Sequence, residues 1–177
     1  MNGNIFTKPT QVFKEALEAP NLGIAILIVL IVSLIFGAIF FIGTGNIILG
    51  ATVTITSIVQ WLVLSIIYYI FEFMFTAKQK HKIKTNFLGI ISATSKLWLM
   101  MLVLEVLLGI ALLGGIILTI AGILSIIVLV LILINSFILM KIILDTTNTR
   151  SFIAWFLAIL IYMLLLTIAS ILTQLLI

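Results

Sequence analysis

The sequence predicts an all-α, polytopic membrane protein: a bundle of five transmembrane helices preceded by a short amphipathic helix. Three observations lead to this fold class: the composition, the spacing of the apolar runs and the placement of the basic residues. Hydrophobic residues make up 64% of the 177, and charged residues only 8%. Soluble domains are about 45–50% apolar and about 25% charged. A water-soluble domain cannot hide this much apolar surface, which excludes most soluble enzyme folds, nucleic-acid-binding proteins and disordered linkers.

The first expected element is a short helix within residues 1–20, the segment that precedes the apolar runs. Pro9 or Thr10 can begin this helix, and Pro20 ends it. Its apolar residues share one face and its charged residues the other: Val12, Phe13, Ala16 and Leu17 against Lys14, Glu15 and Glu18. We therefore expect an amphipathic, interfacial helix on the cytoplasmic surface of the membrane.

Five apolar runs follow, and each is long enough to cross about 30 Å of hydrocarbon, which takes about 20 residues. Together they form a single membrane domain over residues 1–177, with spans expected at 22–42, 47–75, 97–118, 121–140 and 151–174. Residues 97–140 are too long for one helix, so they must contain a turn. The candidate break points are Gly114-Gly115 and Gly122.

Residues 87–95 are interpreted as an interfacial or partly inserted helix. A span that began at Phe87 would place Lys96 about 13 Å deep, where a charge costs at least about 2.5–3.5 kcal/mol. If the third span begins near Leu97 instead, Lys96 can reach the surface with its ammonium group, and Trp98 can anchor the helix at the interface.

The basic residues support a count of five spans. If five spans alternate, all nine fall on the same side as the N-terminus: Lys8, Lys14, Lys78, Lys80, Lys82, Lys84, Lys96, Lys141 and Arg150. Four or six spans would break this segregation. The positive-inside rule then predicts a multi-pass protein of the cell membrane with its N-terminus in the cytoplasm and its C-terminus outside.

Polar side chains inside the predicted spans form a candidate intramembrane site: Glu105, Gln60 and Asn135. Glu105 lies about eight residues into the third span, roughly 12 Å from its boundary. An ionisable group at that depth is a functional-site hypothesis by default. Two interpretations stay open: Glu105 serves proton relay or cation coordination, or it ties helices together through Gln60, Ser125 or Asn135.

Charged residues near the predicted cytoplasmic boundary provide two further candidates. Glu72 is a candidate interfacial ion-pair partner of Lys96 or Lys141. The other candidate is a polybasic run that acts as a topology determinant or contacts anionic lipid headgroups, at about 1 kcal/mol per lysine: Lys78, Lys80, Lys82 and Lys84. The expected partners are the lipid bilayer, a second copy of the chain or another membrane protein, and no nucleic acid.

The sequence lacks the residues that intramembrane enzymes use. Its lone histidine, His81, lies in the polybasic run, and Asp145 is its one aspartate. A Ser/His/Asp set within the membrane, a His-Glu-x-x-His zinc site and a two-aspartate protease are therefore excluded. We expect no enzymatic activity, no cofactor and no metal.

Short motifs at the start of the chain and around two spans follow a pattern found in known membrane proteins. The residues that carry it are Pro9, Phe13, Leu17 and Pro20, then Trp61, Ile66, Ile67 and Tyr69, and the run Ser92-Ala93-Thr94-Ser95-Lys96-Leu97. In these residues and in its five-span layout, the chain resembles a prokaryotic member of the Yip1 domain family. The resemblance implies a membrane-organising or adaptor role, which in eukaryotes is linked to vesicle traffic and small GTPase binding. The alternative is a small transporter or ion/lipid conduit that uses Glu105.

Overall fold

Six α-helices make up the described part of the chain, in agreement with the all-α prediction. The computed structural model describes residues 4–76, 86–111 and 114–176, with side chains up to residue 168. The helices are α1 (Pro9–Glu18), α2 (Leu22–Thr44), α3 (Ile47–Thr76), α4 (Phe87–Ala111), α5 (Gly115–Leu144) and α6 (Asn148–Leu176). Five of them, α2 to α6, are long and apolar enough to cross a membrane. The chain is therefore a multi-pass membrane protein.

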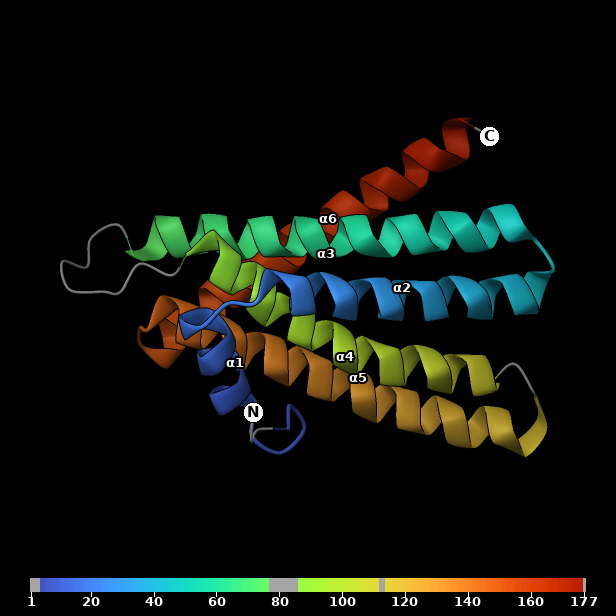
Figure 1. Ribbon diagram of the computed structural model, residues 1–177, viewed down its shortest axis with the longest axis horizontal. Coiled ribbons are helices and arrows are strands. Elements are labelled where there is room, and N and C mark those ends of the chain that lie inside the picture. The colour runs from blue at the N-terminus through green and yellow to red at the C-terminus, as the bar shows by residue number, and fades with distance from the viewer. Residues whose placement is uncertain (1–3, 77–85, 112–113, 177) are drawn as a thin grey trace.

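The long helices run back and forth along one axis (Figure 1). α2 and α4 point one way, and α3 and α5 point the other. We call the end of the bundle that carries α1 the α1 end, and the opposite end, where Gly45 and Gly114 connect the helices, the glycine-turn end. α6 begins at the α1 end against α5 and α3 and then diverges, so that its last turns stand apart from the bundle.

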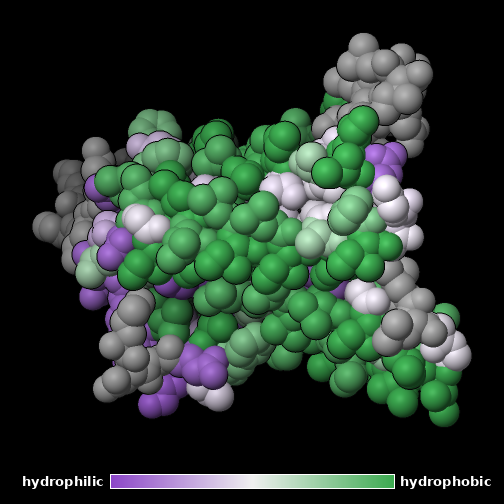
Figure 2. Space-filling model, turned by 45° about the vertical axis from the view of Figure 1, so that its right-hand side comes forward, coloured by the Kyte–Doolittle hydropathy of each residue, from purple (hydrophilic) through white to green (hydrophobic). Residues whose placement is uncertain are grey.

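The surface of the bundle follows the same axis. Figure 2 shows apolar side chains over most of its flank, while hydrophilic side chains gather mainly at the α1 end. A flank of this kind suits hydrocarbon, in which side chains need no water. Within the helices, threonine hydroxyls bond to carbonyl groups one turn earlier, as Thr52 does to Ile48 at 2.9 Å.

Glycines with positive φ lie where one spanning helix ends and the next begins. Gly45 closes α2 with a φ of 68°, and Gly114 and Gly115 have φ values of 75° and 61° between α4 and α5. Residues with a side chain rarely adopt this left-handed conformation. Of the two predicted break points, Gly114-Gly115 is confirmed as the turn, and Gly122 stays inside α5. The predicted span bounds 97–118 and 121–140 are wrong, because α4 ends at Ala111 and α5 begins at Gly115.

Residues 87–95 are the first turns of α4 and do not form a separate interfacial helix. Residues 89–95 are buried, and Ser95 donates a hydrogen bond to the Ser92 carbonyl at 2.7 Å. Ser92 and Ser95 are both buried. The Thr94 hydroxyl likewise donates to the Ile90 carbonyl, at 2.9 Å, so Thr94 and Ser95 are buried with their hydroxyls paired within their own helix.

α1 is amphipathic, and its apolar face packs against protein rather than lipid. It contacts the start of α4 and the end of α5, and Phe13 is fully buried in the core cluster together with Ile90 and Ile143. A Cβ atom on Gly89 of α4 would lie only 2.8 Å from the Leu17 carbonyl oxygen. The helix that the sequence assigned to the membrane surface therefore caps one end of the bundle.

We expect Phe13→Ala to lower the free energy of unfolding by about 3–5 kcal/mol, because it leaves a cavity where α1 meets α4 and α5. Phe6→Ala is the matched control, since Phe6 lies on the same segment and is 46% exposed. Its substitution should cost about 0.5 kcal/mol or less. The measurement is unfolding of the purified protein by SDS in mild detergent micelles, followed by circular dichroism. Equal losses in the two variants would contradict the packing of α1.

Candidate functional site

Hydroxyl and indole groups form a buried polar contact between α3 and α4. Trp61 Nε1 donates a hydrogen bond to Thr94 Oγ1 at 3.1 Å, and Ser65 Oγ shares a hydrogen bond of 2.7 Å with the same oxygen. Thr94 Oγ1 also donates to the Ile90 carbonyl at 2.9 Å. All three side chains are buried. Since an unpaired buried polar group costs about 1–3 kcal/mol, this cluster selects the faces on which α3 and α4 meet.

A second buried polar contact, one turn nearer the glycine-turn end, joins α2, α3 and α4. Ser33 of α2 donates to Ser57 of α3 at 3.0 Å, and Trp98 Nε1 of α4 donates to the same Ser57 oxygen at 3.4 Å. Trp98 is buried. It therefore acts as a hydrogen-bond donor inside the bundle and not as the interface anchor that its sequence position predicted.

A third contact holds the first half of α6. Trp155 Nε1 donates to Ser136 Oγ of α5 at 2.8 Å, and the hydroxyl of Tyr68 donates to the Ser136 carbonyl at 3.2 Å. Ala154 and Ala158 are fully buried on α6, one turn apart, which is the spacing that lets helices approach closely. Each of the three tryptophans thus binds one helix to another, a role that composition alone did not reveal.

The predicted intramembrane site of Glu105, Gln60 and Asn135 is dispersed in the structure. Glu105 lies nine residues before Gly114, and Asn135 lies twenty residues after Gly115 on the antiparallel helix. The difference of eleven residues separates their levels by about 16 Å along the bundle. Asn135 Nδ2 donates to the Leu131 carbonyl of its own helix at 2.8 Å. Ser57 of α3 is at the level of Trp98, which lies seven residues before Glu105 on α4. Gln60, half-buried on α3, lies one turn from Ser57 toward the α1 end and so still farther from Glu105.

Two residues of the predicted site keep a buried polar atom without a partner among the described residues, Asn135 at Oδ1 and Glu105 at Oε2, and the ionisable one is Glu105. Its side chain is only 5% exposed, and its Oε2 atom has no hydrogen-bond partner among the described residues. Ser125 of α5 lies ten residues after Gly115 and so at the level of Glu105, but its hydroxyl donates to the Ala121 carbonyl at 2.8 Å. Buried acceptors without a donor are uncommon in folded proteins. Glu105 can therefore accept a hydrogen bond from a ligand.

The charged candidates lie toward the α1 end. Glu72 of α3 and Lys96 of α4 are both buried, and Lys141 of α5 is exposed. The ion pair of Glu72 with Lys96 or Lys141 stays a prediction. Lys78, Lys80, Lys82 and Lys84 lie outside the described residues, so their contact with anionic lipid headgroups also stays a prediction.

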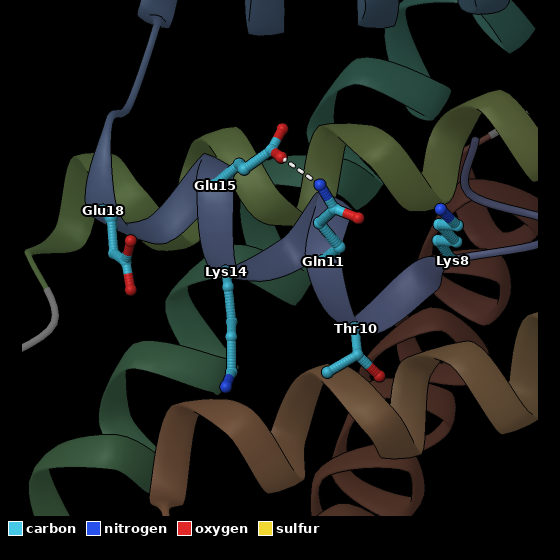
Figure 3. Close-up of a pocket in the computed structure, with 6 residues that line it drawn as sticks. All are labelled: Lys8, Thr10, Gln11, Lys14, Glu15 and Glu18. Atoms are coloured by element: carbon cyan, nitrogen blue, oxygen red, sulfur yellow. Dashed lines mark hydrogen bonds between the residues drawn. The ribbon is translucent and has the colours of Figure 1, made fainter. Parts of the chain in front are cut away.

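α1 carries a face of mostly exposed polar side chains, which Figure 3 draws as sticks. Six residues of this face border a shallow surface hollow: Lys8, Thr10, Gln11, Lys14, Glu15 and Glu18. Gln11 Nε2 donates to Glu15 Oε1 at 2.9 Å, one turn along the helix. We call this set the α1 polar face. Because the opposite side of α1 is packed on α4 and α5, the α1 polar face has a fixed orientation.

Comparisons with known proteins assign no family to the chain. No protein-family model, no curated protein and no solved structure matches it. The resemblance to the Yip1 domain family stays a prediction.

We expect Thr94→Val to lower the free energy of unfolding by about 1–3 kcal/mol, because it leaves the Trp61 indole without its acceptor. Thr56→Val is the matched control: it removes an exposed hydroxyl that bonds to the Thr52 carbonyl of the same helix. SDS unfolding of both variants in the same micelles measures the difference. A loss for Thr94→Val no larger than that of the control would show that the contact contributes nothing to the assembly of α3 and α4.

Proposed function

We propose that this protein is a non-enzymatic membrane adaptor that organises other proteins at the cytoplasmic face of the cell membrane. The observation that supports this most is the fixed α1 polar face. A docking surface that is already ordered loses little conformational entropy when a partner binds. α1 meets this condition because Phe13 and Leu17 hold it against α4 and α5.

The placement of charge supports a cytoplasmic α1 end. The described Lys and Arg residues all lie toward this end: Lys8, Lys14, Lys96, Lys141 and Arg150. Cytoplasmic segments of membrane proteins carry an excess of these residues. The proposal therefore has the N-terminus in the cytoplasm and the C-terminus outside, and it agrees with the role that the resemblance to the Yip1 domain family implies.

We expect a photo-crosslinking amino acid at Lys14 to give a discrete protein adduct when cells that express the protein are irradiated. Lys14 is exposed on the α1 polar face. The control is the same amino acid at Leu34 of α2, a flank residue that is 59% exposed and should react with lipid. The adducts are compared by gel mobility and identified by mass spectrometry. A protein adduct of the same size from both positions, or none from Lys14, would contradict the adaptor role.

A second candidate function, a small transporter or conduit, is supported by the unpartnered Oε2 atom of Glu105. A conduit must bring water or an ion to this carboxyl group in at least one state, whereas an adaptor can keep it dry.

Because the chain has no cysteine, Glu105→Cys introduces the only thiol, and its reactivity measures whether water reaches position 105. A conduit predicts rapid labelling by a small membrane-impermeant thiol reagent. The control is Lys14→Cys, which should react from the cytoplasmic side alone and so also tests the orientation. A reactive control together with an unreactive thiol at position 105 would contradict an aqueous conduit.

A further inference from the structure

A cleft opens between α2 and α4 toward the glycine-turn end. It has a volume of ≈ 580 Å³ and is lined by aliphatic side chains and glycines from residues 35–43 of α2 and 106–110 of α4. Ligand sites in proteins are typically about 300–1,000 Å³ and mostly apolar, with a few polar groups that orient the ligand. The residues that line this cleft are all apolar, so a polar group that orients a ligand there has to come from a residue beside the lining.

Glu105 adjoins this cleft but is not one of the residues that line it. It precedes Val106, which lines the cleft, and lies one turn before Gly109 on α4. Four residues rotate the helix by about 400°, so Glu105 and Gly109 point only about 40° apart. Gly109 faces α2, because a Cβ atom there would lie 3.2 Å from the Cγ2 atom of Ile39. Glu105 therefore also points toward the α2 side of α4, one turn deeper than Gly109.

The chemistry of Glu105 determines which ligand would suit the cleft. Its buried Oε2 atom lacks a donor among the described residues. The residues that α5 places at this level are Ala121 and Ser125, neither of which is charged. A buried carboxylate is expensive unless a cation pairs with it. An ammonium group supplies both a positive charge and three N–H donors.

We propose that this cleft binds a lipophilic primary amine, with the alkyl chain between α2 and α4 and the ammonium group donating to Glu105 Oε2. The ligand enters from the hydrocarbon, because the cleft lining is aliphatic and glycine. The proposal names the ligand of the Glu105 site and shares that residue with the second candidate function. It does not depend on the adaptor role of α1.

The test measures binding of radiolabelled dodecylamine to the full-length protein in phosphatidylcholine nanodiscs, with the uptake of empty nanodiscs subtracted. We expect saturable binding that Glu105→Gln weakens by about tenfold or more, because a hydrogen bond to a charged group is lost. Dodecanol, which has the same chain and no charge, should bind more weakly and equally to both proteins. Equal dodecylamine affinity for Glu105→Gln and the unaltered chain would overturn the proposal.

A pair of variants that avoids the buried carboxyl tests the cleft separately. Val106→Phe adds bulk within the cleft, at a side chain that is 40% exposed, and Val103→Phe is its matched control on the same helix at 37% exposed. Val106→Phe should abolish saturable dodecylamine binding, and Val103→Phe should leave it unchanged. Unchanged binding in both variants would exclude the cleft as the site.

The labelling of Glu105→Cys tests the aqueous conduit, and the dodecylamine assay tests the amine site, so either proposal can fail without the other. Binding of dodecylamine to the unaltered chain, together with a thiol at position 105 that aqueous reagent does not reach, would rule out an aqueous conduit and support entry from the lipid. Rapid aqueous labelling without saturable amine binding would support the conduit and overturn the amine site.

Discussion

In a bilayer, the helices of this protein gain little from burying apolar side chains against one another, because the surrounding lipid is equally apolar. The bundle therefore depends on close backbone approach and on hydrogen bonds between helices. Gly50 illustrates the first, since a Cβ atom there would lie 2.8 Å from the Gly37 carbonyl oxygen. The bond from Trp61 to Thr94 illustrates the second. Both constrain which faces of α2, α3 and α4 can meet, and so where Glu105 points.

The two ends of the bundle are held by different forces. At the α1 end, Phe13 sits in a core cluster with residues of α4 and α5. If this end lies in water, as we propose, the hydrophobic effect adds to packing and fixes α1 firmly. Toward the glycine-turn end, α2 and α4 leave a cleft of ≈ 580 Å³, and α6 stands apart. The tightly packed end suits a docking surface, and the open end suits a lipid-soluble ligand.

Much of the candidate site could not be predicted from the sequence. The sequence distinguishes Glu105 by its depth in an apolar run, and in the structure its side chain is buried. The sequence groups Gln60 and Asn135 with it only because all three are polar, whereas residue counts along the antiparallel helices place them at other levels. Depth follows from counting along one helix. Proximity depends on how helices are paired and rotated, which a one-dimensional pattern does not contain.

The sequence by itself determined the fold class, the five spanning helices and the amphipathic character of α1, because hydropathy and helical periodicity are properties of neighbouring residues. Only the tertiary structure decided that α1 packs on protein, that Trp98 is buried and that α5 begins at Gly115 and not near Ala121. The physical reason is the same in each case. An apolar face, an indole or a glycine suits lipid contact as well as protein contact, and the choice between them is made by the helix that packs against it.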